Sequence, residues 1–192
     1  MISALILAAG QSKRMGRPKM LLPWGNTTVL EKVIATFKSA GVEDILVLTG
    51  GARGQVEGLV GESARCIFNP DHARGEMLSS VQVGLAELKS GVEATLIGLG
   101  DQPQVQESSV QLVVDEYHNS GASIVVPSFR MRRGHPWLVA RTHWEEVLNM
   151  RSSESLRDFL NNHSEEINYV EVDNNSILQD LDTPEDYLKS RP

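Results

Sequence analysis

The sequence predicts an α/β fold in which helices cover both faces of a mostly parallel β-sheet. Short apolar runs alternate with amphipathic stretches along the chain, and strands that are buried on both faces read as continuous apolar runs. The length of 192 residues, with 41% hydrophobic and 22% charged residues, suits one domain with a sizeable core. We therefore expect a single three-layer domain over residues 1–192, with right-handed crossovers between its strands.

Hydrophobic periodicity and turn residues place the individual elements. Strands are expected at residues 5–8, 45–48, 95–99, 124–126 and 167–172, and helices at residues 29–39, 77–89, 108–118 and 142–150. A last helix is expected to begin at Pro184, with Thr183 as its N-cap. Residues 50–54 and 130–134 read as loops, and residues 127–141 are expected to hold short strands or a hairpin.

Net charge, cysteine content and the apolar N-terminal run indicate which cellular compartment and which binding partners to expect. The formal net charge of -7 and the pI near 5.2 oppose non-specific binding to nucleic acid or to an anionic membrane. Cys66 is the only cysteine, which excludes an intrachain disulfide and a multi-cysteine metal site and fits a reducing compartment. The apolar run of residues 1–9 is too short to span a bilayer and lacks the basic flank of a signal peptide. We expect a cytoplasmic protein without nucleic-acid or membrane partners.

Parallel sheets bind ligands beyond the carboxyl ends of their strands, so the loops after Ala8, Leu48 and Leu99 are the candidate site. The first of these, residues 9–19, combines two glycines, a serine and four cations. Glycines let backbone N–H groups approach a ligand, and cations neutralise phosphate oxygens, so the composition favours a polyphosphate site. The loop lacks the endings of a P-loop and of a dinucleotide-binding motif. A solvated turn of the same composition is the alternative.

Three carboxylates are candidate ligands for a divalent cation. Asp101 follows the strand expected at residues 95–99, although an aspartate there can also cap the next helix. Asp180 and Asp182 precede the helix cap at Thr183, which leaves both without a structural task. Two carboxylates near a polyphosphate are typical of a site for a hard cation such as Mg2+.

Several motifs follow one another along the chain in a characteristic order. They are Leu7-Ala8-Ala9-Gly10-x-Ser12-x-Arg14-Met15-Gly16-x-x-Lys19 with Leu21-Leu22-Pro23-Trp24, Gly100-Asp101-Gln102-Pro103, Gly134-His135-Pro136, and Asp180-Leu181-Asp182-Thr183-Pro184-Glu185-Asp186-Tyr187. Together they resemble the molybdenum-cofactor nucleotidyltransferases over almost the whole chain. The resemblance implies a Rossmann-like sheet of the nucleotide-diphospho-sugar transferase type. It also implies a magnesium-dependent transfer of a nucleoside monophosphate from an NTP to a phosphorylated acceptor, with release of pyrophosphate.

The first motif also resembles one branch of that family more than the other. The spelling Ala8-Ala9-Gly10 is similar to that of the CTP-using branch, whereas the GTP-using branch typically has Ala-Gly-Gly there. A methyl group at Ala9 would narrow the space beside the base and favour a pyrimidine. The resemblance thus implies CTP as the nucleotide and molybdopterin, or its molybdenum form, as the acceptor, with molybdopterin cytosine dinucleotide as the product.

The resemblance assigns roles to individual residues. Arg14 would hold the departing phosphates, Lys19 would stabilise charge at the α-phosphorus, and Asp101 with Asp182 would bind Mg2+. The nucleotide-binding set comprises Leu7, Ala8, Ala9, Gly10, Ser12, Arg14, Lys19, Asn69, Ser79, Ser80 and Gly100. No protein nucleophile is required, because the acceptor phosphate attacks the α-phosphorus itself, and catalysis then depends on positioning and electrostatics.

Two parts of the implied site have more than one possible role. Ser79 and Ser80 resemble the family's segment near the nucleotide, in the stretch from residue 74 to residue 80, but they would equally serve as helix caps. His135, in Gly134-His135-Pro136, is a candidate general base, metal ligand or acceptor-binding residue, and the resemblance favours acceptor binding for this motif. The remaining histidines are expected to be solvated; they are His72, His118, His143 and His163.

Other functions compete with this one. A guanylyltransferase or a sugar-phosphate nucleotidyltransferase would use the same chemistry, but Ala9 and the motif at residues 134–136 argue against both. A molybdenum-cofactor carrier or insertion chaperone would dock on an apo-molybdoenzyme without chemistry. Such a carrier has no need for the pyrophosphate-handling set of Arg14, Lys19 and the two metal-binding aspartates, although a dual role stays open.

Overall fold

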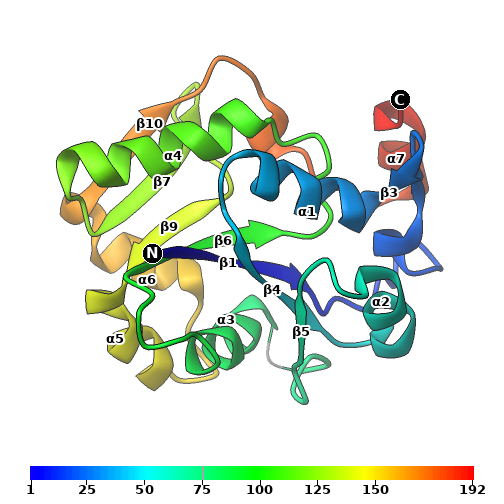
Figure 1. Cartoon of the computed structure of the whole chain (residues 1–192), viewed down its shortest axis with the longest axis horizontal. Coiled ribbons are helices and arrows are strands. Elements are labelled where there is room, and N and C mark those ends of the chain that lie inside the picture. The colour runs from blue at the N-terminus through cyan, green and yellow to red at the C-terminus, as the bar shows by residue number, and fades with distance from the viewer. Residues whose placement is uncertain (75) are drawn as a thin grey trace.

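A computed structural model describes residues 1–74 and 76–192 (Figure 1). Gly75, which lies in the stretch expected near the nucleotide, is outside the described residues. The strands are β1 (Ile2–Ala8), β2 (Pro23–Trp24), β3 (Thr27–Thr28), β4 (Asp44–Thr49), β5 (Arg65–Phe68), β6 (Ala94–Leu99), β7 (Ile124–Phe129), β8 (Arg132–Arg133), β9 (Trp137–Ala140) and β10 (Ile167–Glu171). The α-helices are α1 (Val29–Ser39), α2 (Arg53–Val60), α3 (Glu76–Ala86), α4 (Glu107–Ser120), α5 (Trp144–Asn149), α6 (Leu156–Asn162) and α7 (Pro184–Ser190). None of the described helices has the length and hydropathy that a membrane span requires.

The central sheet has the strand order β10-β7-β9-β6-β1-β4-β5, with β8 paired to β7. The pairs β1–β4, β1–β6, β4–β5 and β7–β10 are parallel. Strand β9 runs antiparallel between β6 and β7, and β8 runs antiparallel to β7. The prediction of a mostly parallel sheet is therefore confirmed.

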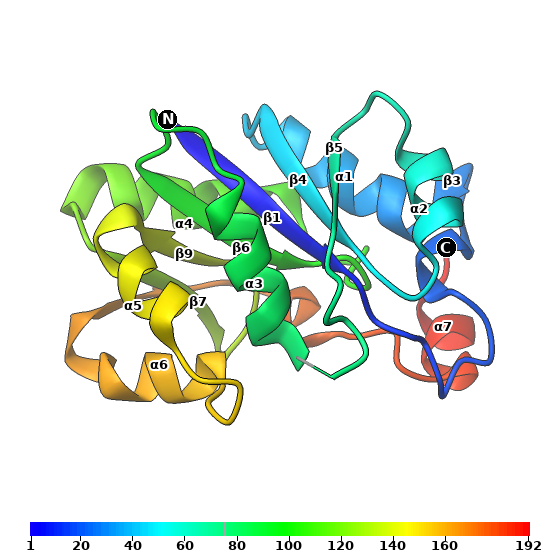
Figure 2. The same cartoon turned by 90° about the horizontal axis from the view of Figure 1, so that it is seen from below.

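Helices cover the sheet on both sides, which gives three layers (Figures 1 and 2). Alternate residues of β1 explain the arrangement, because successive side chains of a strand point to opposite faces. Ala4 and Ile6 pack with α1, α2 and α4, whereas Leu5 and Leu7 pack with α3, α5 and α6. Burial on both faces is why this strand reads as a continuous apolar run.

Most of the expected elements are present, with shifts at their ends. Helix α1 has the predicted bounds, and Thr28 caps it in a reciprocal pair with Glu31. The stretch at residues 142–150 divides into a short 3-10 helix and α5. Residues 127–141 contain the end of β7, β8 and β9, as expected for short strands. The prediction of a loop at residues 130–134 is wrong in part, because β8 lies within it. The prediction of a loop at residues 50–54 is wrong at its end, because α2 begins at Arg53.

The segment after β10 returns across the carboxyl edge of the sheet. Its backbone is joined to the β6 loop, where the Leu181 N–H donates to the carbonyl of Asp101 at 3.2 Å. Helix α7 follows and is capped by Thr183 with Asp186, with Pro184 in its first turn, as predicted. The hydroxyl of Tyr187 donates to the carbonyl of Pro23 at 2.7 Å, so this helix is fastened beside β2 and β3.

Candidate functional site

Three loops meet at the carboxyl edge of the sheet because β4, β1 and β6 are neighbours in it. The Gly100 N–H donates to the carbonyl of Leu7 at 3.0 Å, and the Gly51 N–H donates to the carbonyl of Ala9 at 3.4 Å. A Cβ at Gly50 would lie 2.7 Å from the Cβ of His72, so glycine permits the close approach there. The loops expected to form the site are thus brought together.

The loop after β1 is held in a fixed shape by Ser12. Its carbonyl accepts the N–H groups of Met15 and Gly16 at 3.0 and 3.2 Å, and its hydroxyl accepts the backbone N–H of Lys19 at 3.1 Å. Ser12 and Gly16 adopt left-handed φ values of 48° and 70°. The loop therefore curls back on itself and directs the Lys19 side chain toward the β6 loop.

A cavity of about 440 Å³ opens beside this loop. Its lining carries more cations than carboxylates and consists of Gly10, Gln11, Ser12, Lys13, Arg14, Lys19, His72, Ala73, Arg74, Glu76 and Asp182. An adjoining cavity of about 340 Å³ is lined by Gly10, Gln11, Ser12, Pro18, Gly51, Ala52 and His72. His72 borders both cavities and is half-buried between them.

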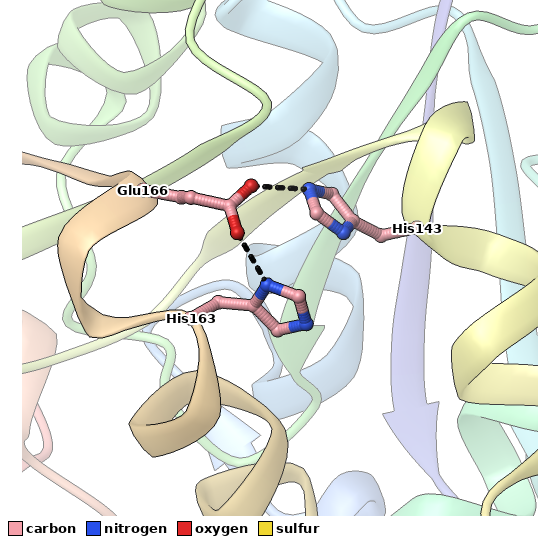
Figure 3. Close-up of side chains that lie close together, drawn as sticks. All are labelled: His143, His163 and Glu166. Carbon is pink, nitrogen blue, oxygen red and sulfur yellow. Dashed lines mark hydrogen bonds and ion pairs between the residues drawn. The ribbon is translucent and has the colours of Figure 1, made fainter.

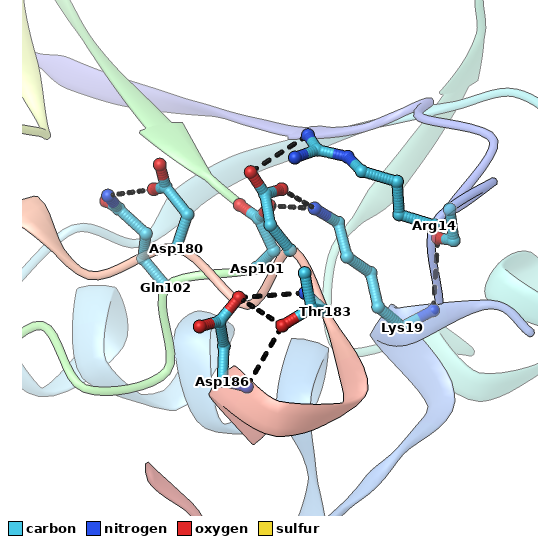
Figure 4. Close-up of polar contacts among 9 residues, drawn as sticks. Arg14, Lys19, Asp101, Gln102, Asp180, Thr183 and Asp186 are labelled. Carbon is cyan, nitrogen blue, oxygen red and sulfur yellow. Dashed lines mark hydrogen bonds and ion pairs between the residues drawn. The ribbon is translucent and has the colours of Figure 1, made fainter. Parts of the chain in front are cut away.

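Four charged side chains from three distant segments meet beside this cavity, and three of them, Arg14, Lys19 and Asp182, line it. Figure 4 shows Arg14, Lys19 and Asp101 side by side. The Lys19 ammonium donates to Asp101 Oδ2 and also lies 3.3 Å from Asp182 Oδ1. The Arg14 guanidinium donates to Asp182 Oδ2 at 2.9 Å. The side chains of Lys19 and Asp101 are each 13% exposed, whereas Asp182 is 36% exposed and Arg14 70% exposed. The inner pair is shielded from water, and the outer pair faces it.

The electrostatics of the cluster depend on Lys19. Burial alone lowers the pKa of this amine, but attraction to Asp101 and Asp182 outweighs burial, and its pKa is raised above the ordinary 10.5. Lys19 is therefore a cation throughout the physiological range. Its single positive charge lies close to two carboxylates and reduces the repulsion between them.

Asp180 has the structural task that the sequence did not reveal. Its Oδ1 accepts a hydrogen bond of 2.7 Å from Gln102 Nε2, which links the last segment to the β6 loop (Figure 4). Burial, followed by repulsion from Asp101 and Asp182, raises the pKa of Asp180 above the ordinary 3.8. The side chain thus turns away from Lys19 and toward the buried amide.

Three of the predicted nucleotide-binding side chains interact with one another. Asn69, which is fully buried at the end of β5, donates from Nδ2 to the hydroxyls of Ser79 and Ser80 at 2.9 Å each. Helix α3 begins at Glu76, so both serines lie inside the helix and the capping alternative is wrong. Ser80 is 3% exposed. This cluster fixes the carboxyl end of β5 against α3.

The strand residues of the predicted set contribute little side-chain surface. Leu7 and Ala8 are 8% and 3% exposed and belong to the two hydrophobic cores on opposite faces of the sheet. Ala9 is 7% exposed, and Gly10 is exposed at the loop entrance. Gly10 is thus the most exposed of these four residues, and Ala9 directly precedes it at the loop entrance.

The motif Gly134-His135-Pro136 lies at the same edge of the sheet, because it precedes β9 and Trp137 pairs with Ile97 near the end of β6. A Cβ at Gly134 would lie 2.5 Å from the carbonyl oxygen of Ile177, and the His135 N–H donates to that carbonyl at 3.1 Å. The motif is therefore seated directly on the last segment of the chain.

The His135 imidazole is neutral. It stacks on Trp137 with a centroid distance of 4.4 Å and an interplanar angle of 16°. Burial lowers the pKa of His135 to about 4. Its buried Nε2 has no hydrogen-bond partner among the described residues, so one polar position of the ring is left unsatisfied there.

Residues 4–167 match the family model of the MobA-like NTP transferase domain. The chain belongs to this family. It is 28% identical to the molybdenum cofactor cytidylyltransferase of Escherichia coli (strain K12), with 99% of this chain and 95% of that protein covered. It is also 28% identical to the nicotine blue oxidoreductase of Paenarthrobacter nicotinovorans, with 96% and 93% covered.

A solved structure of similar shape belongs to Rv0371c from Mycobacterium tuberculosis H37Rv. It superposes with a TM-score of 0.87 at 28% identity and covers 98% of this chain and 95% of that one. Rv0371c has also been solved in complex with manganese, with a TM-score of 0.83 at 26% identity and 98% and 96% covered. The predicted family, the predicted fold and the prediction of a nucleotidyltransferase are confirmed.

Proposed function

We propose that this MobA-like enzyme transfers CMP from CTP to molybdopterin, forming molybdopterin cytosine dinucleotide and pyrophosphate with Mg2+ as cofactor. The observation that carries the proposal is the convergence of Arg14, Lys19, Asp101 and Asp182 beside a cation-lined cavity. The similarity to the E. coli molybdenum cofactor cytidylyltransferase over nearly both full chains supports the choice of substrates. The sequence Ala8-Ala9-Gly10 supports CTP rather than GTP as the nucleotide substrate.

The residues present fit a hard divalent cation. Asp101 and Asp182 contact one ammonium group from two sides, so their carboxylates are close enough to share a single cation. Oxygen ligands of this type suit Mg2+. Asp180 is excluded from the pair because it is engaged with Gln102. When bound, Mg2+ would neutralise charge on the triphosphate oxygens.

The transfer itself requires no covalent enzyme intermediate. An oxygen of the molybdopterin phosphate attacks the α-phosphorus in line, the bond to the bridging oxygen breaks, and pyrophosphate departs with the bonding electron pair. Lys19 lies deep in the site and would stabilise charge that develops at the α-phosphoryl group. Arg14 is on the exposed side, where it would hold the departing phosphates. Gly10 and Ser12 would border the triphosphate.

Acceptor binding is assigned to the Gly134-His135-Pro136 motif. The neutral His135 ring has a nitrogen without a hydrogen-bond partner in the described part of the chain and an aromatic neighbour in Trp137. A neutral imidazole can donate or accept one hydrogen bond without bringing a further positive charge to the site. This motif adjoins the Asp180–Asp182 segment through Ile177, so the acceptor and the nucleotide would meet at one edge of the sheet.

Pyrophosphate release tests the proposal directly. The enzyme is incubated with Mg2+ and each of CTP, GTP, UTP and ATP, in combination with molybdopterin or with a sugar 1-phosphate. We expect release only from CTP with molybdopterin. Preference for GTP would identify a guanylyltransferase, and turnover with the sugar phosphate would identify a sugar-nucleotide enzyme. Tight molybdopterin binding without pyrophosphate from any pair would indicate a carrier and overturn the proposal.

A further inference from the structure

A second cluster of ligand-type side chains lies at the edge of the sheet opposite the nucleotide site. His143 follows β9, whose last residue Ala140 pairs with Ala94 at the start of β6. Glu166 immediately precedes β10, whose first residue pairs with the first residue of β7. Both residues therefore lie where the parallel strands begin, whereas the nucleotide site lies where they end. The cluster is independent of the proposed transfer reaction.

The side chains of the cluster face one another (Figure 3). His163 Nδ1 lies 2.8 Å from Glu166 Oε1, and His143 Nε2 lies 3.7 Å from Glu166 Oε2. One ligand atom from each of the three residues falls within 4.8 Å of the other two. Tetrahedral zinc with bonds of about 2.0–2.2 Å places neighbouring ligand atoms about 3.3–3.6 Å apart. The observed distances lie on either side of that spacing.

The surrounding fold holds the two imidazoles in place. His143 is 8% exposed, which corrects the expectation that it is solvated, and its ring packs edge-on against Phe159 and His163 at centroid distances of 5.7 and 4.8 Å. His163 ends α6, and its N–H donates to the carbonyl of Phe159 at 3.2 Å. The rings are thus positioned by packing before any ligand arrives.

A carboxylate supports the far side of His163. Glu146, on α5, lies 2.9 Å from His163 Nε2 through Oε2. Imidazoles that bind metals commonly donate their second N–H to a carboxylate, which fixes the tautomer and orients the ring. In the absence of metal, His163 Nδ1 is hydrogen-bonded to Glu166 Oε1 at 2.8 Å. A zinc ion would take the place of the proton on Nδ1, while Nε2–H would stay directed at Glu146.

We propose that His143 Nε2, His163 Nδ1 and the Glu166 carboxylate bind one zinc ion, with Glu146 as the outer carboxylate. Two imidazoles and one carboxylate are a common ligand set for zinc. Ser123 Oγ lies 2.9 Å from His143 Nε2, so a water held by this hydroxyl can complete the coordination. The ion joins the end of β9, the end of α6 and the start of β10, so it acts as a stabilising link.

Zinc binding to the metal-stripped full chain tests the proposal. We expect isothermal titration with ZnCl2 to give one site and the melting temperature to rise by about 5–10 °C at a zinc concentration about 100-fold above Kd. His163→Gln and Glu166→Gln should each abolish this site and the rise in Tm. Glu166 is 52% exposed, so its amide variant preserves the fold, which circular dichroism without metal verifies.

Two further variants serve as controls. His118→Gln replaces an exposed histidine of α4 and should bind zinc like the wild type, as should Asp182→Asn at the nucleotide site. The proposal is overturned if zinc neither binds nor raises Tm, if both cluster variants bind as the wild type does, or if Asp182→Asn removes the site. Pyrophosphate release with Mg2+ is measured separately, so failure of the zinc site and failure of the transfer reaction are distinguishable.

Discussion

Replacement of Lys19 by methionine removes the ammonium group that neutralises Asp101 and Asp182 while keeping a side chain of similar length. A hydrogen bond to a charged group contributes about 1.5–3 kcal/mol to stability, and solvent screening reduces the contribution of the more exposed Asp182 contact. We therefore expect Lys19→Met to lower the free energy of unfolding by about 2 kcal/mol at neutral pH. For a chain of this size, that corresponds to a fall in Tm of about 4–8 °C.

The same variant should respond to Mg2+ more strongly than the wild type does. In the wild type, a divalent cation must compete with the Lys19 ammonium for Asp101 and Asp182, whereas in the variant both carboxylates are free. Millimolar MgCl2 is expected to restore much of the lost Tm. Turnover should nevertheless stay low and fall more steeply than CTP affinity, because the ammonium acts mainly in the transition state.

The assay is thermal and urea unfolding with and without MgCl2, with Arg14→Met as the matched control. Arg14 pairs with the same Asp182 but its side chain is 70% exposed, so its loss should cost no more than about 1 kcal/mol. Wild-type stability of Lys19→Met in the absence of metal would refute the neutralising role. A Tm deficit that Mg2+ leaves unchanged would refute the shared cation site.

Three other predictions follow from the site. Asp101→Asn should lower kcat at least about 100-fold, while Asp180→Asn, which keeps the oxygen that accepts from Gln102, should retain most activity; equal losses in pyrophosphate release would contradict the assignment. Because the pKa of His135 falls from 6.5 to about 4 on folding, the unfolded chain binds more protons between these values. The free energy of unfolding should then drop by roughly 3 kcal/mol as the pH falls from 6.5 to about 4. His135→Gln should remove this pH dependence, which urea unfolding at several pH values measures. Ala9→Gly should lower the ratio of kcat/KM for CTP to kcat/KM for GTP by roughly ten- to hundred-fold. An unchanged ratio would contradict the proposal that the Ala9 methyl group excludes a purine.

Hydrophobic periodicity predicted the parts of the fold that are buried on a regular face. Helix α1 matched its expected range because six of its residues face the core and a capping box marks its start. Helix α2 was missed because Gly54 and Gly58 weaken its pattern and only Val56 and Val60 are buried. Such a short helix depends on packing rather than on its own propensity. Strand β5 is a four-residue edge strand that begins with an exposed arginine, which gave no alternating signal.

The sequence predicted the charged residues of the site better than it predicted the contacts that residues elsewhere make. Asp101 and Asp182 were identified from their motifs, and the fold brings them to one ammonium group. The role of Asp180 was missed because its partner Gln102 is remote in the chain. The pairing of His143 with His163 was equally invisible, since it arises only because the end of β9 and the start of β10 lie at the same edge of the sheet, on either side of β7. Contacts of this kind depend on the order of the strands in the sheet, which the spacing of residues along the sequence does not show.

The match to the family ends at residue 167, yet Asp182 and the carbonyl that seats His135 lie beyond it. The segment that brings them packs Leu181 and Tyr187 into a small cluster of six buried residues and hydrogen-bonds to the β6 loop and to β2, whereas the sheet is held by two much larger cores. Regions with few buried contacts open at lower free energy than the core. We therefore expect this segment to open before the sheet does, so that mild denaturant abolishes activity reversibly while the sheet stays folded.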